Sequence, residues 1–246
     1  MRTWNTELVR FLEKLGFKQL FADSSVFVRG IVTGDFIIIV LHVDDQNMFA
    51  MTRPLIDDFK AALHAQYGIE DVGETKYFIG IKVLYDRPRR TIKLWQPKYI
   101  SDILARFELP NFGLVTIPTY PTDLCPKSKE AKAVAALNPY RQLIRSLMYL
   151  MIGTRPDLAQ PLCVLSQFLI NPGRVHWDAA LRLLAYVKAT SQVGLRYTGE
   201  TAGTLPKIIG TSDASWATHV DDCTSQAGYG CVVEVLSNLK GRVLLY

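Results

Sequence analysis

The sequence predicts an α+β fold from three observations. Strand-like apolar segments occur before residue 96 and after residue 206, residues 140–190 show helical periodicity, and a proline-rich stretch precedes that helical region. Five prolines lie between residues 109 and 139, which indicates a long connector. With 246 residues, 49% of them hydrophobic and 21% charged, the chain is long enough to bury a core without disulfide bonds.

The part before the connector alternates helices and strands. Apolar residues from Leu8 to Leu15 recur at helical spacing, and Gly16 ends that helix. The segment 36–43 is apolar on both faces, so we expect a buried central strand. The predicted elements are a helix over 5–15, strands over 26–29, 36–43 and 46–51, a helix over 54–67, a hairpin of 77–85 and 91–95, and a helix over 97–107.

The part after the connector begins helical and ends strand-like. Asn171, Pro172 and Gly173 separate two of its helical segments. The predicted elements are helices over 140–152, 156–170 and 174–190, a strand over 194–197, and strands over 207–212, 226–235 and 242–246.

The positive charge is concentrated in one region. The chain has a net charge of +5, but residues 1–123 are neutral, residues 124–207 carry +7 and residues 208–246 carry −2. The middle region is therefore a candidate surface for a polyanion. An ordinary solvated basic face of a helical region explains the same charge equally well.

Several classes of protein are disfavoured. The four cysteines show no CxxC spacing and the four histidines are scattered, so the sequence indicates no zinc site. A chain of this size does not need disulfide bonds, so a reducing compartment fits best. The N-terminus carries charges where a signal peptide needs apolar residues. The longest apolar run, 36–41, is far shorter than the roughly 20 residues of a membrane span. We expect an intracellular protein, cytoplasmic or nuclear.

Two adjacent carboxylates end the apolar strand over 36–43. Asp44 and Asp45 would repel by about 4 kcal/mol at ~4 Å in an effective dielectric near 20, and a divalent cation would relieve that repulsion. Mg²⁺ takes one or two carboxylates together with phosphates, and a pair of such ions can promote phosphoryl transfer. On the pattern alone, a solvated β-turn is the favoured alternative.

Two weaker signals lie further along the chain. Asp213 follows another apolar strand and could bind a second metal, although a turn or a helix cap explains it as well. Gly80 lies inside a predicted strand, where it could let a primer strand approach closely, but a β-bulge is the simpler explanation.

Taken together and in order, these segments resemble the Pol polyprotein of copia-type retrotransposons. Residues 41–45 (LHVDD) resemble the reverse-transcriptase active-site box, and residues 71–81 (DVGETKYFIGI) resemble the primer-grip hairpin. Residues 140–168 resemble the thumb and connection helices, and residues 212–217 (SDASWA) resemble the start of RNase H. The resemblance reverses the preference for a solvated turn at Asp44 and Asp45.

The resemblance implies a domain plan and a function. It assigns residues 1–108 to a partial reverse-transcriptase palm, 109–139 to the connector, 140–200 to a helical thumb and connection, and 201–246 to the first strands of a truncated RNase H-like sheet. The implied activity is RNA-directed DNA synthesis on a template–primer from dNTPs. Asp44 and Asp45 would be catalytic and bind Mg²⁺, and Asp213 would belong to an incomplete RNase H metal site. The implied nucleic-acid-binding residues are His42, Tyr77, Phe78, Gly80, Arg141, Arg145, Arg155 and Lys188.

Departures from the family pattern qualify that expectation. His42 replaces a usual tyrosine, Gln46 a usual apolar residue and Arg145 a usual glycine. The fingers and the third palm aspartate of the family lie upstream of the matching segments, so we expect a fragment that is inactive alone, with the edge of the strand over 36–43 left unpaired. The alternative is a non-catalytic nucleic-acid-binding remnant of a transposable element.

Overall fold

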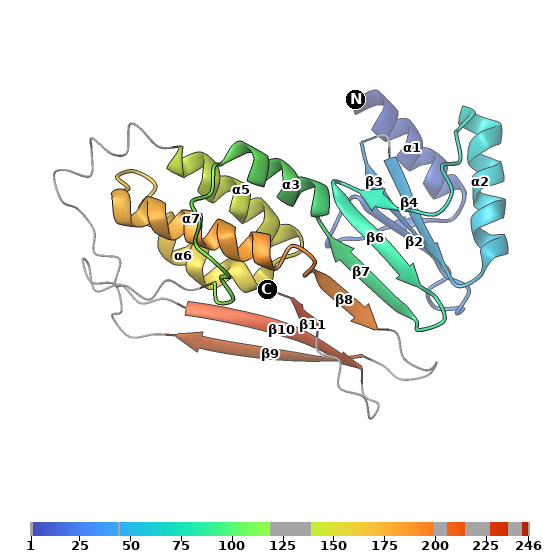
Figure 1. Cartoon of the computed structure of the whole chain (residues 1–246). Coiled ribbons are helices and arrows are strands. Elements are labelled where there is room, and N and C mark those ends of the chain that lie inside the picture. The colour runs from blue at the N-terminus through green and yellow to red at the C-terminus, as the bar shows by residue number, and fades with distance from the viewer. Residues whose placement is uncertain are drawn as a thin grey trace. The chain divides into compact units, whose positions relative to one another are not determined.

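The computed structural model describes residues 2–43, 45–118, 139–198, 206–214, 227–235 and 243–245. In these segments the fold is α+β, as predicted, and its strands form three antiparallel sheets (Figure 1). The chain divides into two compact units, residues 1–75 and 76–246. The domain boundaries expected at residues 108, 139 and 200 stay predictions.

The first unit is a sheet covered by two helices. Its strands follow the order β1-β2-β3-β4. Its elements are α1 (Arg2–Lys14), β1 (Lys18–Gln19), β2 (Val26–Arg29), β3 (Ile37–His42), β4 (Asp45–Ala50) and α2 (Arg53–Tyr67). The predicted elements of this part are confirmed. The two-residue strand β1 was missed because it is too short to show an apolar pattern.

The strand β3 lies inside the sheet, as its apolar sequence predicted. Ile37, Ile39 and Leu41 are buried in one cluster with residues of both helices, including Leu12 and Phe59. The side chains between them face the other side of the sheet because strand residues alternate. The expectation of an unpaired edge on this strand is wrong, since β2 and β4 hydrogen-bond to its two sides.

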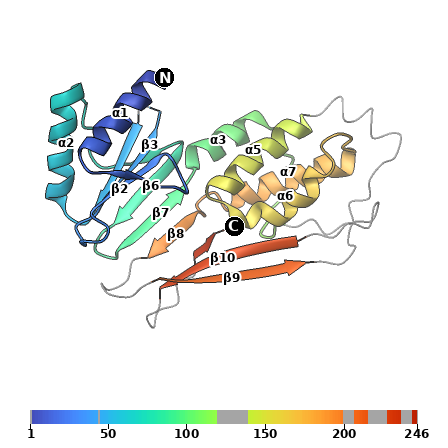
Figure 2. The ribbon, with the colours of Figure 1, turned by 180° about the vertical axis from the view of Figure 1, so that it is seen from behind.

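The second unit begins with a sheet and a group of helices. The sheet has the order β5-β6-β7-β8. The elements are β5 (Tyr77–Phe78), β6 (Ile81–Asp86), β7 (Thr91–Trp95), α3 (Pro97–Arg106), α5 (Tyr140–Gly153), the 3₁₀ turn η1 (Pro156–Leu158), α6 (Ala159–Ser166), α7 (Arg174–Ala189) and β8 (Leu195–Thr198). Figure 2 shows α3, α5, α6 and α7 gathered side by side.

One predicted strand of this sheet is in fact two. Residues 77–85 were expected to run straight, but the chain reverses at Ile79 and Gly80, so that Phe78 pairs with Ile81. Both turn residues have positive φ, 49° and 75°, which is the conformation of a two-residue hairpin loop. The apolar pattern continues through the turn, so the sequence does not reveal where the chain reverses.

The helices of the second unit enclose its core. Tyr140 of α5 is buried, and its hydroxyl donates a 2.7 Å hydrogen bond to the carbonyl oxygen of Leu165 in α6. Burial raises the pKa of the Tyr140 hydroxyl. At the start of α7, the backbone N–H of Gly173 donates to Nδ1 of His176, and burial lowers the pKa of that imidazole. The predicted helix over 156–170 begins as η1 and ends at Ser166.

A third sheet has the order β11-β10-β9 and confirms the strands predicted near the C-terminus. Its strands are β9 (Pro206–Ala214), β10 (Ala227–Val235) and β11 (Val243–Leu245). Among the helices that the structure describes, none is long and apolar enough to cross a membrane.

Candidate functional site

The β3–β4 hairpin presents the predicted carboxylates. His42 pairs with Asp45 across the hairpin, so only two residues form the turn. Val43, the first of them, has φ of 57°. A β-branched residue in this left-handed region costs about 1–3 kcal/mol, and such strain concentrates at functional sites. Asp44 lies outside the described residues.

Asp45 projects from the start of β4 beside His42. The two residues are directly opposite in the antiparallel ladder, which places their side chains on the same face of the sheet. Both side chains are exposed. An exposed carboxylate at a fixed strand end suits Mg²⁺, which keeps part of its water shell. In the described part of the chain, no three or more His, Cys, Asp or Glu side chains gather into a metal site.

A buried hydrogen bond holds β4 next to the hairpin turn. Asn47 lies two residues after Asp45, on the same face, and is only 7% exposed. Its Oδ1 accepts a 2.7 Å hydrogen bond from Oγ1 of Thr75. Sequence reasoning gave Asn47 no role and named Thr75 only as part of the segment 71–81. The signal was a polar pair, Gln46 and Asn47, inside an otherwise apolar strand.

Gln46 faces the opposite side of the sheet, toward the helices. It pairs with the buried Leu41, and its own Oε1 is buried and has no hydrogen-bond partner among the residues that the structure describes. A buried polar group left unsatisfied costs about 1–3 kcal/mol. The apolar residue that the family resemblance implies at this position would avoid that cost.

We therefore expect Gln46→Leu to raise the free energy of unfolding of the first unit by about 1 kcal/mol. Urea unfolding followed through hydrogen exchange of the β3 and β4 amides measures the change. Gln66→Leu is the control, because Gln66 is exposed on α2 and its replacement should have an effect below about 0.5 kcal/mol. Equal effects of the two substitutions would contradict the explanation.

The predicted primer-grip residues lie on the β5–β6 hairpin. Tyr77 is 58% exposed, and the ammonium of Lys82 lies 5.9 Å from its ring centroid. The hydroxyl of Tyr149 in α5 donates a 3.1 Å hydrogen bond to the carbonyl oxygen of Ile79. That hydroxyl also lies 3.5 Å from where a side chain at Gly80 would begin. Tyr149 therefore supports the turn that carries Gly80, a role that the sequence did not reveal.

The predicted cations on the helices differ in accessibility. Arg141 and Arg145 lie one turn apart on α5 and are exposed, and Lys188 is exposed in the last turn of α7. The guanidinium of Arg141 also donates a 3.3 Å hydrogen bond to the carbonyl oxygen of Leu169. These three side chains can reach a phosphate backbone.

Arg155 does not fit its predicted role in nucleic-acid binding. It is 0% exposed, and its guanidinium forms two hydrogen bonds with Asp157, at 2.9 and 2.7 Å. It also donates to the carbonyl oxygen and the hydroxyl of Thr190, at 3.1 and 2.7 Å. The hydroxyl of Tyr186 completes the network by donating to Asp157. The buried guanidinium, with these four hydrogen bonds, holds η1 against the end of α7 and has no access to a phosphate.

Asp213 is exposed on β9, opposite Gly228 in the ladder. Its Oδ1 accepts a hydrogen bond from the backbone N–H of Ala214. Asp221 and Asp222, which the sequence placed near it, lie outside the described residues. Its assignment to an RNase H metal site stays a prediction.

Comparison with known proteins shows to which class of protein the chain belongs. Residues 1–121 match the family model described as reverse transcriptase (RNA-dependent DNA polymerase). These residues contain the β3–β4 hairpin and the β5–β6 hairpin. The chain is thus a protein of the reverse-transcriptase type. No solved structure matches it significantly.

Relatives extend the match along nearly the whole chain. It is 32% identical over 233 residues to the retrovirus-related Pol polyprotein from transposon TNT 1-94 of Nicotiana tabacum, covering 93% of this chain and 17% of the relative. It is 32% identical to the Pol polyprotein from transposon RE1 of Arabidopsis thaliana, covering 93% and 15%. It is 26% identical to the putative transposon Ty5-1 protein YCL074W of Saccharomyces cerevisiae, covering 92% and 71%. The chain belongs to the Pol polyproteins of copia-type retrotransposons, and it spans about a sixth of the length of the first two relatives.

Proposed function

We propose that the β3–β4 hairpin is the metal-binding hairpin of an RNA-directed DNA polymerase, with Asp44 and Asp45 as its carboxylates. The observation that carries the proposal is the left-handed Val43 at a two-residue turn, which delivers an exposed Asp45 from a buried strand. A strained turn supported by a rigid sheet positions carboxylates more accurately than a mobile loop does. The family match over residues 1–121 supports the same assignment.

In this proposal the chain's residues bind and orient the substrates. Asp45 is held by the β4 ladder and by the Thr75–Asn47 hydrogen bond behind it. The β5–β6 hairpin, with Tyr77, Phe78 and Gly80, contacts the primer strand. The exposed cations on α5 and α7 bind the template–primer backbone independently of sequence. Mg²⁺, when bound, polarises the α-phosphate of the dNTP and lowers the pKa of the primer 3′-hydroxyl.

Binding of Mn²⁺, which prefers the same oxygen ligands as Mg²⁺, tests the metal site. We expect added Mn²⁺ to broaden the backbone amide resonances of residues 42–48 before those of other segments. The double substitution Asp44→Asn and Asp45→Asn should abolish this broadening because it removes both charged ligands.

Asp57 and Asp58 provide a matched control, because they are another adjacent pair of exposed aspartates, on α2. The same double substitution at these positions should leave the broadening at residues 42–48 unchanged. Broadening that survives in the Asp44/Asp45 variant would contradict the proposal.

Primer extension gives a second readout. The family's third carboxylate is not among the segments that these 246 residues match, so a polypeptide of these residues alone should incorporate no dNTP above the Asp45→Asn variant. Duplex binding without any Mn²⁺ effect at residues 42–48 would favour a non-catalytic nucleic-acid-binding protein instead.

A further inference from the structure

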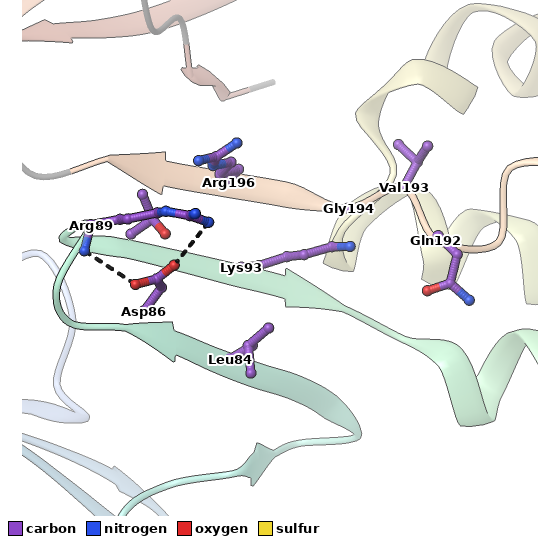
Figure 3. Close-up of a pocket in the computed structure, with 9 residues that line it drawn as sticks. Leu84, Asp86, Arg89, Lys93, Gln192, Val193, Gly194 and Arg196 are labelled. Atoms are coloured by element: carbon purple, nitrogen blue, oxygen red, sulfur yellow. Dashed lines mark hydrogen bonds and ion pairs between the residues drawn. The ribbon is translucent and has the colours of Figure 1, made fainter.

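A basic hollow lies on one face of the β5–β8 sheet, within the second unit. It has a volume of about 460 Å³ and is formed by β6, β7, the turn between them and the start of β8 (Figure 3). Its polar lining includes Asp86, Arg89, Lys93, Gln192 and Arg196. Figure 3 shows the side chains of Arg89, Lys93 and Arg196 on the same side of the strands.

Two of these cations occupy an electrostatically unfavourable register. Lys93 of β7 pairs directly with Arg196 of β8, so their side chains are neighbours on one face. Like charges that are directly opposite in a sheet destabilise it. Asp86 is the carboxylate in the lining, and it is already engaged by Arg89 through a 3.1 Å backbone hydrogen bond and a 3.6 Å ion pair. The register therefore favours an added anion between Lys93 and Arg196.

The ammonium of Lys93 is also held in place. It lies 4.8 Å from the ring centroid of Trp95, which is 7% exposed, and the ammonium of Lys82 lies 5.1 Å from the same ring. Such cation–π contacts orient an ammonium without neutralising it. The cations on this face are thus arranged before any ligand binds.

The row of cations is longer than one phosphate needs. Residues 82–93 contain five cations and one carboxylate, although residues 1–123 as a whole are neutral. Lys82 extends the row along β6 toward Tyr77 of β5, with which it pairs. A series of cations on one face of a sheet, half-buried at Lys82 and Lys93 and exposed at Arg89 and Arg196, matches a repeating polyanion.

We propose that this face of the β5–β8 sheet binds the phosphate backbone of a nucleic acid through Arg89, Lys93 and Arg196. The inference rests on the proposed function and extends it, because it moves part of the nucleic-acid contact from the basic middle region onto this sheet. Of the three cations, only Arg196 lies in the region 124–207 that the charge pattern favoured.

Fluorescence anisotropy of a labelled primed duplex, titrated with the full chain at several salt concentrations, tests the proposal. The double substitution Lys93→Glu and Arg196→Glu should weaken binding at least about tenfold near 0.1 M salt. It should also reduce the slope of log K against log salt by about 1.8, because two phosphate contacts are lost. Arg10→Glu with Arg53→Glu is the control, since it changes the charge equally at two exposed arginines of the first unit.

The outcomes separate this proposal from the proposed function. A loss in the Lys93/Arg196 variant with less than about a threefold change in the control supports the proposal. Equal losses in the two variants, or an unchanged salt slope, overturn it and leave template–primer binding in place. No binding by the unaltered chain overturns both. In another outcome, polyglutamate binds as tightly as the duplex and loses that binding in the Lys93/Arg196 variant. That result would assign the face to an acidic protein and overturn the proposal. The double substitution Lys93→Gln and Arg196→Gln guards against a folding defect caused by the glutamates. It should also weaken duplex binding.

Discussion

Replacing Arg155 with alanine is expected to lower the free energy of unfolding of the second unit by about 3–5 kcal/mol. The substitution removes four hydrogen bonds, to Asp157 and Thr190, from a guanidinium that is 0% exposed. It leaves the Asp157 carboxylate facing Tyr186 without its cation. Urea unfolding monitored by hydrogen exchange of the α5 and α7 amides measures the loss.

Arg174→Ala is the matched control. Arg174 also pairs with an aspartate, Asp178, but its side chain is 73% exposed, so its loss should cost less than about 1 kcal/mol. Arg155→Lys should be destabilising as well, because an ammonium cannot replace the two-pronged contact with Asp157. Similar effects of Arg155→Ala and Arg174→Ala would refute a structural role for the network.

The same pair predicts a pH dependence. Burial alone raises the pKa of Asp157, but the hydrogen bonds and charge of Arg155 outweigh it and hold that pKa below its usual value. The ionised carboxylate therefore stabilises the fold fully above the unfolded pKa of about 3.9, and this stabilisation is lost as the pH falls through the lower folded value. The difference in stability between the parent chain and Arg155→Ala should shrink below about pH 4.

Replacing Gly194 with alanine should have the second largest effect, a loss of about 3 kcal/mol. A Cβ at this position would overlap the backbone carbonyl oxygen of Leu94 and lie 2.6 Å from Cβ of Trp95. Neither atom can move unless β8 separates from β7, because both belong to the strand to which β8 pairs. Hydrogen exchange of the β7 and β8 amides should accelerate together.

Gly210→Ala separates this steric effect from the general effect of replacing a strand glycine. Gly210 lies in β9, is exposed, and has no atom within 4 Å of an added Cβ. Its replacement should change stability by less than about 0.5 kcal/mol. Unchanged exchange in β7 and β8 of the Gly194→Ala variant would show that the close approach is not required.

Local patterns explain why most elements could be predicted. Helices such as α2 and α3 have a proline in their first turn and follow apolar spacing, and both features depend only on neighbouring residues. The turn at Ile79 and Gly80 was missed because its residues continue an apolar run. Its position depends on Tyr149, which is 70 residues away in the sequence.

The candidate site divides in the same way. Asp44 and Asp45 stood out because two charges end an apolar strand, and this contrast is visible in a few consecutive residues. The Thr75–Asn47 hydrogen bond and the Lys93–Arg196 pair join residues that are 28 and more than 100 positions apart, so no local pattern indicates them.

The sequence by itself determined the α+β class, the order of most helices and strands, and the place of Asp45 directly after the apolar strand β3. These features follow from side-chain periodicity and turn residues, which act over a few positions. Tertiary structure decided whether each charge is available. Arg155 and Arg196 are both arginines in the basic region, yet the first is 0% exposed in a hydrogen-bonded network and the second is exposed opposite Lys93. Burial and hydrogen bonds to Asp157 and Thr190 engage the guanidinium of Arg155, whereas strand pairing leaves the side chain of Arg196 exposed to solvent.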